Sequence, residues 1–301
     1  MSALRRSVAR SAPWLAAAAL LALVFWRVDL DATLAAFAAA DWKRFAAAAL
    51  PFAALWLVID AAALSRLVTR FHAPVGFGTL LRLRGGSYLF LAFSYDAAQA
   101  ALALALHRRL GIPLAALAGT FLFYYAIDLL TIAGLGLSGA SALPGVRGEA
   151  LGAALAVLLA GVLVGLVAFG ALARRERLRA AAELVAWRAL FYASFVGFAA
   201  ATLPAFGIHV PLRALVACVP VTLSIAALPI TVSGIGSAQV AMLALYGAFA
   251  EPSAIVAYSL AHSAALVVLR LPIGLLCWPA VASAARPHAS VRNELAGRSG
   301  T

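Results

Sequence analysis

Apolar stretches of about twenty residues recur along this 301-residue chain, and they constrain its fold more than any other feature. A helix of about 20 residues crosses the hydrocarbon core of a bilayer. Hydrophobic residues make up 65% of the sequence and charged residues only 11%, against about 25% charged residues in ordinary globular domains. A soluble chain of this length cannot bury so much apolar surface. We therefore predict an all-α polytopic membrane protein, which excludes a soluble enzyme, a nucleic-acid binder and a secreted domain.

Six stretches have the length and composition of spanning helices. They are residues 11–27, 45–64, 113–137, 150–173, 188–206 and 254–281. The basic residues before the first stretch resemble the start of a signal peptide. Because no soluble domain follows it, we expect this stretch to be retained as the first span.

Two further apolar stretches, 79–106 and 212–249, contain breaks. The first carries Ser94-Tyr95-Asp96 at its centre, and the second is interrupted by prolines and by the run 231–236. A broken helix leaves backbone groups unpaired, which a membrane protein tolerates only where protein or water covers them. We expect two re-entrant or broken helical hairpins; two complete spans are the alternative for 212–249.

The basic residues predict the orientation. Seventeen of the 23 Lys and Arg lie in segments 1–10, 65–86, 107–112, 174–188 and 282–301, whereas the segments between them hold five. Cytoplasmic loops of membrane proteins carry an excess of Lys and Arg. We expect a multi-pass protein of the bacterial inner membrane, with both termini in the cytoplasm and the basic loops on the anionic cytoplasmic leaflet. Because the positive-inside rule accounts for most of these basic residues, the net charge of +12 does not indicate a nucleic-acid partner, and we expect none.

The order of spans and hairpins suggests two halves. Residues 1–285 form one transmembrane domain, whose halves 1–137 and 150–285 each give two spans, a hairpin and a span. We expect an inverted repeat, which in transporters places a site near the midplane. Residues 29–44 fit a short interfacial helix, and 286–301 a polar cytoplasmic tail.

Polar residues in each hairpin are candidates for substrate binding. Those of the first hairpin are Ser94, Asp96 and Gln99, and those of the second are Ser233, Gly234, Gly236 and Gln239. Ser94 or Asp96 can cap a half-helix, as can Ser233 or Ser237. Helix N-termini at mid-depth attract anions such as a lipid phosphate. Alternatively, the caps only satisfy the broken backbone, and the glycines only let helices pack closely.

Two charged residues lie inside spans, where charge is costly. Asp128 lines a polar pathway, pairs with a cation, or accepts a hydrogen bond from a tyrosine such as Tyr124. Arg270 binds a phosphate bidentately or neutralises Asp128 or Asp96. His262 fits a packing role, and Asp60, near the cytoplasmic end of its span, is expected to pair with a loop arginine.

No sequence motif indicates catalysis, a metal or a cofactor. The chain has no HExxH, DxD, GxSxG or P-loop pattern, and its two cysteines, Cys218 and Cys277, form no paired motif. We therefore expect no enzymatic activity and no cofactor. A Ser/His/Asp set could be chosen from the polar residues, but nothing in the sequence places its members together.

Several runs resemble the lysylphosphatidylglycerol synthase transmembrane-region family, also called the flippase-like family. They are 228–239 (LPITVSGIGSAQ), 270–274 (RLPIG), 95–96 with 108–113 (RRLGIP), and Asp128. The chain departs from the family pattern at Tyr124-Tyr125, where the family has Glu-Arg, and at Ala238-Gln239, where it has Arg-Glu. Two charged pairs of the family are thus replaced by neutral groups. If those charges couple transport to protons or bind a headgroup in the family, this protein would differ from it in energy coupling or in substrate.

The resemblance implies movement of a lipid, or of a lipid-linked headgroup, between leaflets. We expect a flippase-like protein that holds an anionic headgroup between the hairpin tips with the help of Arg270. The alternative is a non-transporting scaffold for a lipid- or envelope-modifying pathway, which would have a protein partner. A lipid-modifying enzyme within the membrane is disfavoured, because no nucleophile or metal site is evident.

Overall fold

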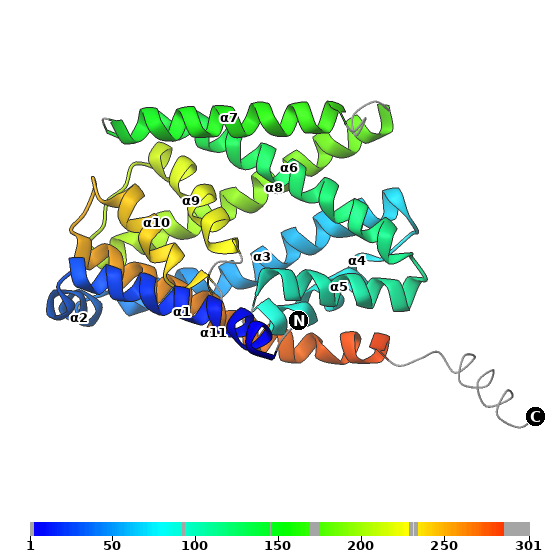
Figure 1. The fold of residues 1–301 in the computed structure, drawn as a ribbon, viewed down its shortest axis with the longest axis horizontal. Helices are drawn as coiled ribbons and strands as arrows, with labels where there is room; N and C mark the ends of the chain where they lie inside the picture. The colour runs from blue at the N-terminus through cyan, green and yellow to red at the C-terminus, as the bar shows by residue number, and fades with distance from the viewer. Residues whose placement is uncertain are drawn as a thin grey trace, which may run out of the picture.

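The computed structural model of the protein is helical throughout its described residues, which are 3–91, 94–144, 146–168, 175–228, 231 and 234–285. Side-chain contacts are described from residue 14 onward. The helices are α1 (Ala3–Arg27), α2 (Leu30–Ala38), α3 (Trp42–Phe71), α4 (Phe77–Leu91), α5 (Tyr95–Leu110), α6 (Leu114–Ala140), α7 (Val146–Ala168), α8 (Arg175–Thr202), the 3₁₀ turn η1 (Leu203–Phe206), α9 (Leu212–Ala227), α10 (Ser237–Tyr246) and α11 (Pro252–Ala285). In Figure 1, α7 lies along one edge of the molecule, and α1, α2 and α11 lie along the opposite edge.

Among the described residues, five helices are long and apolar enough to cross a membrane. They are α3, α6, α7, α8 with η1, and α11. Each overlaps one of the predicted spans, although residues 169–173 of the predicted span 150–173 lie outside the described residues. The prediction of an all-α chain with several apolar helices of spanning length is therefore confirmed. The remaining prediction, 11–27, falls in α1, whose described apolar part, Trp14–Arg27, is shorter than a spanning helix.

Helices extend further than the apolar runs, so two boundary predictions are wrong. Residues 175–188 form the first half of α8 rather than a loop. The segment 29–44 is not one helix: Asp29 caps α2, and Asp41 caps α3. In both caps the carboxylate accepts backbone N–H groups, which ends one helix and starts the next.

Both broken stretches form pairs of short helices. The first pair, α4 and α5, has 15 and 16 residues, and the second, α9 and α10, has 16 and 10. At a rise of about 1.5 Å per residue, none of these helices alone reaches the roughly 30 Å of a bilayer core. The two members of each pair pack on each other.

Aromatic side chains join α3 to α8 at the centre of the molecule. Phe52 stacks on Phe198 with ring centroids 4.3 Å apart, and its edge meets Phe195 at 4.8 Å. Trp56, one turn further along α3, stacks on Tyr88 of α4 at 5.1 Å. This buried aromatic layer fixes α3, α4 and α8 relative to one another, and these are the helices that carry most of the buried charges.

Glycines let α4 cross α11 at very short range. A Cβ atom at Gly86 would lie 2.5 Å from Cγ2 of Val281 and 3.0 Å from the backbone oxygen of Cys277. On the facing helix, a Cβ at Gly274 would lie 2.7 Å from Cγ of Leu89. Small residues are the usual means by which membrane helices approach closely.

The crossing gives a stability prediction. We expect Gly86→Ala to lower the free energy of unfolding by about 1–3 kcal/mol, because α4 and α11 must move apart to admit the methyl group. Gly134→Ala on α6 is the control, since a Cβ there meets nothing within 4 Å. Thermal unfolding in detergent measures both variants, and equal unfolding temperatures for the two would contradict the close crossing.

Candidate functional site

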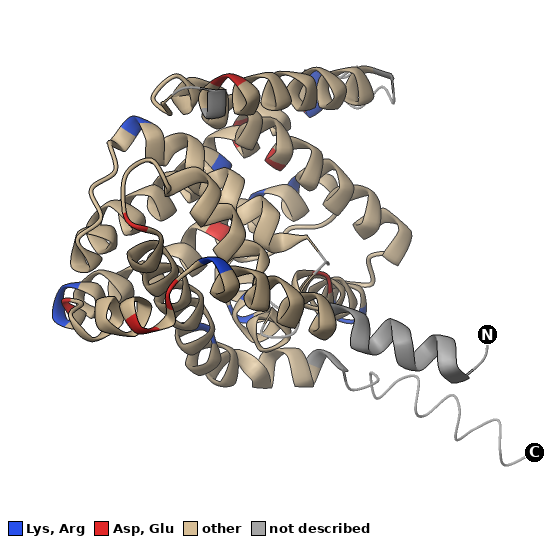
Figure 2. Ribbon diagram, turned by 60° about the vertical axis from the view of Figure 1, so that its left-hand side comes forward, with Lys and Arg blue, Asp and Glu red and all other residues tan. Residues whose placement is uncertain are grey.

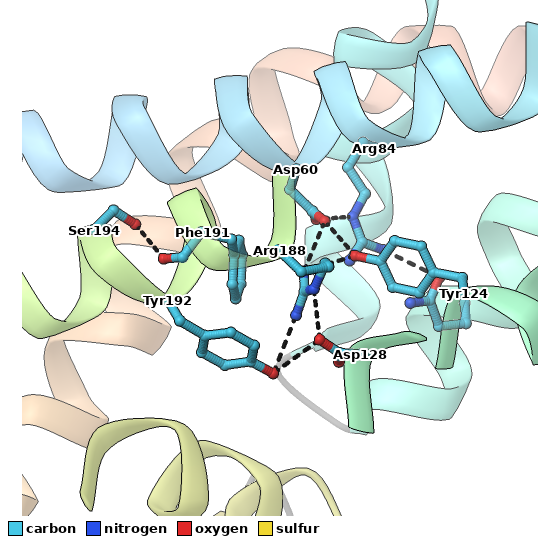
Figure 3. Close-up of polar contacts among 9 residues, drawn as sticks. Asp60, Arg84, Tyr124, Asp128, Arg188, Phe191, Tyr192 and Ser194 are labelled. Carbon is cyan, nitrogen blue, oxygen red and sulfur yellow. Dashed lines mark hydrogen bonds and ion pairs between the residues drawn. The ribbon is translucent and has the colours of Figure 1, made fainter. Parts of the chain in front are cut away.

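Asp60 of α3 lies at the centre of a buried polar network (Figure 3). Its Oδ2 accepts a hydrogen bond from Nε of Arg84 at 2.5 Å, and its Oδ1 accepts one from the hydroxyl of Tyr124 at 3.1 Å. A guanidinium nitrogen of Arg188 lies 3.8 Å from the same Oδ1. The Asp60 side chain is only 2% exposed, so all of these contacts form away from solvent.

Asp128 of α6 closes the other end of the network. Its Oδ1 accepts hydrogen bonds from Nε of Arg188 at 2.5 Å and from the hydroxyl of Tyr192 at 2.9 Å. Arg188 also donates to the hydroxyl of Tyr124 at 2.7 Å. Asp128 therefore pairs with a cation, as one of the sequence alternatives predicted. Its tyrosine partner is Tyr192 of α8, not its neighbour Tyr124.

The charged residues of the network come from four helices, α3, α4, α6 and α8, and their formal charges cancel. Two carboxylates, Asp60 and Asp128, face two guanidinium groups, Arg84 and Arg188. Isolated charges in a membrane interior cost several kcal/mol, so balanced pairs are what such a site requires. Figure 2 shows that most of the ribbon between the helix ends carries no charged residue.

Arg270, near the middle of α11, lies outside this balance. Its guanidinium carbon sits 4.3 Å from the ring centre of Trp56. Its Nε is buried and has no hydrogen-bond partner among the described residues, and no carboxylate of the described chain pairs with it. The alternative in which Arg270 neutralises Asp128 is therefore wrong, because Asp128 is paired with Arg188. Among the described residues, Arg270 is therefore a partly buried cation without a carboxylate partner.

A small cavity lies beside Arg270, with a volume of about 40 Å³. Its walls come from α9, α10 and α11. The polar side chains that line it are Thr222, His262, Ser263 and Arg270. His262 and Arg270 thus lie on one wall, as their spacing on a helix predicts. The Nδ1 of His262 lies 3.4 Å from the hydroxyl of Tyr258, so this ring also has the packing contact expected of it.

The candidates of the first helix pair have separate environments. Ser94 caps α5, since its hydroxyl accepts a hydrogen bond from the backbone N–H of Ala97 at 3.0 Å. Gln99 is buried, and its Oε1 accepts a hydrogen bond from Arg84 at 3.3 Å. Asp96 is exposed on the first turn of α5. Of these three, the structure brings only Gln99 into the buried network.

In the second pair the predicted serine cap is wrong. Gly236 is the N-cap of α10, and its backbone N–H donates to Oε1 of Gln239 at 2.6 Å. Ser237 instead donates to the backbone oxygen of Gly234 at 3.1 Å. Ser233 lies outside the described residues. The side-chain oxygen of Gln239 therefore caps the start of α10, and its Nε2 donates a hydrogen bond to Oγ of Ser263 at 3.3 Å.

Gly234 and Gly236 have backbone conformations that favour glycine, with φ values of +75° and +93°. A Cβ at Gly234 would lie 2.7 Å from the backbone oxygen of Ala226, and one at Gly236 would lie 2.9 Å from Cβ of Leu20 on α1. The glycines thus serve the turn and the close packing of α9 and α1 around it. From the sequence alone, these glycines could serve either close helix packing or close approach of the backbone to a ligand. The structure shows the packing role.

Sequence reasoning missed Arg84 and Arg188, because both were counted with cytoplasmic loops. It expected Asp60 to pair with a loop arginine, and Arg84 is that partner, but from inside a helix. One signal was available: each arginine has a tyrosine four residues later, Tyr88 and Tyr192, which shares its helix face.

Comparison with known proteins adds no relatives. No model of a known protein family matches the chain, and a search of curated proteins finds no match. Among the described residues, no group of three or more His, Cys, Asp or Glu side chains is placed to hold a metal ion. The fold and the charges define the class: a helical protein with several membrane-length apolar helices, a charge-balanced core network and, among the described core residues, one arginine without a carboxylate partner.

The network predicts a large effect of removing its central charge. We expect Asp60→Asn to lower the free energy of unfolding by about 3–5 kcal/mol, because Arg84 and Arg188 then share a buried site without sufficient negative charge. Asp96→Asn is the control, since Asp96 is exposed. Chemical denaturation in detergent, followed by circular dichroism, measures the difference. A loss of stability equal to that of the control would show that the network is dispensable.

Proposed function

We propose that this protein binds an anionic lipid headgroup at Arg270 and moves that lipid between the leaflets of a bacterial inner membrane. The observation that supports this most directly is that Arg270, without a carboxylate partner among the described residues, lies beside a cavity with polar walls. A cation in a membrane interior is stabilised by a bound anion. A guanidinium group suits phosphate, because it can donate two parallel hydrogen bonds to it.

The cavity has further groups that suit a headgroup. Ser263 and Thr222 carry hydroxyls on its wall, and hydroxyls can either donate to or accept from a phosphate or a sugar. The amide of Gln239 lies 3.3 Å from the Ser263 hydroxyl at the edge of this cavity. The indole of Trp56 covers the guanidinium of Arg270 and leaves its edge available.

Translocation is supported by the way the two helix pairs pack. The short helix α4 of the first pair packs on α11 of the second half, and α9 of the second pair packs on α6 of the first half. Likewise α4 contacts α3, and α9 contacts α8, while α3 and α8 contact each other. Such reciprocal contacts fit two inverted halves, 1–137 and 150–285, with re-entrant pairs α4–α5 and α9–α10. Transporters of this plan alternate access around a site between the halves.

The charge distribution supports a cytoplasmic location of both termini. Arg84 and Arg188 are buried, so they no longer count as loop residues, and fifteen cytoplasmic basic residues remain against five on the other side. The bias still fits the positive-inside rule. The resemblance of several motifs in this chain to those of the flippase-like family also supports the proposal.

The binding step gives a direct prediction. The purified wild-type protein should retain an anionic or polyprenyl-linked lipid, and Arg270→Ala should lose it, because Arg270 is the one Arg or Lys among the described residues that line the cavity. Mass spectrometry of copurifying lipids measures this. The control is Arg213→Ala, which removes an exposed arginine from the start of α9. Retention of the same lipid by Arg270→Ala, in a variant that is folded, would overturn the proposal.

The transport step needs a separate test. In phosphatidylcholine vesicles that contain a fluorescent phosphatidylglycerol, the wild type should make inner-leaflet probe accessible to an external quencher faster than empty vesicles do. Arg270→Ala should be as slow as empty vesicles. If the protein binds the lipid but does not move it, translocation is wrong, and the non-transporting scaffold becomes the better account.

A further inference from the structure

A second cavity adjoins the Arg270 cavity and shares two lining residues on α11 with it. It is an open groove of about 620 Å³ between α1 and α2 on one side and α11 on the other, the helices that share one edge of the molecule in Figure 1. Its walls are almost entirely apolar. They include Phe25, Leu34, Phe37, Leu260, Ala264 and Val268.

The groove and the Arg270 cavity share a wall. Ser263 and Val267 of α11 line both of them. Gln239 lines the groove as well, and its amide lies 3.3 Å from the hydroxyl of Ser263. Polar groups therefore lie at the boundary between the two spaces, and the rest of the groove is lined mainly by apolar residues.

The arrangement has the polarity of an amphiphile. The Arg270 cavity contains a positive charge without a carboxylate partner among the described residues. Hydroxyl and amide groups lie at the wall between this cavity and the groove, and the open groove beyond that wall is lined mainly by apolar residues. An anionic head at Arg270 would leave its attached hydrocarbon chain at the mouth of this groove. Burial of that chain against apolar walls is favourable in the same way as burial in a protein core.

Another groove, on a different part of the molecule, provides a comparison. It also measures about 620 Å³ and is lined by α6, α7 and the first turn of α8. Leu122 and Ala126 of α6 line it and are four residues apart, as Leu260 and Ala264 of α11 are in the first groove. It shares no lining residue with the Arg270 cavity. The two grooves thus have similar volumes and mainly apolar walls, but of the two only the α1–α2–α11 groove borders the Arg270 cavity.

We propose that the groove between α1, α2 and α11 holds a hydrocarbon chain of the same lipid whose anionic head binds Arg270. This inference rests on the proposed headgroup site, and it adds the ligand class: a chain-bearing anionic lipid that reaches the site sideways from the bilayer, rather than a free phosphate that reaches it from water. Gln239 and Ser263 mark the boundary between head and chain.

The test uses phosphatidylglycerol with a photoreactive diazirine in its acyl chain, in nanodiscs that are otherwise phosphatidylcholine. After irradiation, mass spectrometry locates the labelled residues. We expect labels in the wild type to concentrate on the groove residues of α1, α2 and α11. Arg270→Ala should lose these labels, because the chain is held in place by its head.

Two matched variants block one groove each. Ala264→Trp fills the α1–α2–α11 groove from an exposed position and should abolish the groove labels, whereas Ala126→Trp fills the α6–α7 groove and should leave them unchanged. Both tryptophans replace alanines at the rim of a groove, so thermal unfolding should show two folded proteins.

The outcomes separate this inference from the proposed function. If labels cover both grooves equally and persist in Arg270→Ala, the chain site is wrong. If Arg270→Ala releases phosphatidylglycerol but the wild-type labels lie outside the α1–α2–α11 groove, the headgroup site stands and the chain site falls. If Arg270→Ala retains phosphatidylglycerol as the wild type does, the headgroup site fails, and the inference fails with it.

Discussion

The pairing of two carboxylates with two arginines inside the helix bundle is the interaction on which the rest of the structure depends. Asp60 holds Arg84 from one side and lies near Arg188, which binds Asp128 in turn. Each charge would be very costly alone in an apolar interior, so the four helices that carry them must meet in one arrangement. The hydroxyls of Tyr124 and Tyr192 accept further hydrogen bonds from Arg188, and Gln99 accepts one from Arg84. The network thus supplies specificity to helices whose outer faces are uniformly apolar.

Because that network is neutral, Arg270 stands out from it. It is on α11, which packs on both short helix pairs, so the helices around the Arg270 cavity connect the two halves of the chain. Trp56 forms the physical link between the two regions, since it stacks on Tyr88 of α4 and covers the guanidinium of Arg270. In the proposed function, the cavity at Arg270 takes the head of a lipid and the apolar groove beside it takes the chain. The core thus contains a charge-balanced network that joins helices and, among the described residues, one arginine without a carboxylate partner to which we assign ligand binding.

The sequence predicted the helical membrane class, the positions of the long helices and the two breaks, because apolar length and helix-breaking residues are local signals. It left Ser94 or Asp96 as the cap and a cation as one of several partners for Asp128, and the structure has Ser94 as the cap and Arg188 as the partner. It did not predict the partners themselves: Arg188 reaches Asp128 across 60 residues of chain, and a count of basic residues near span ends assigns it to a loop. Gly236 replaced the expected serine cap because Gln239 satisfies the free backbone N–H from within α10. Long-range partners of this kind depend on helix packing, which the spacing of residues does not contain.

The central claim is that an anionic lipid neutralises Arg270 in its cavity. An electron cryo-microscopy structure of the protein in nanodiscs of native bacterial lipid tests this most directly. The account predicts headgroup density within hydrogen-bond distance of the Arg270 guanidinium, continuous with chain density in the groove between α1, α2 and α11. A cavity that holds only water, or a protein carboxylate bound to Arg270, would contradict it.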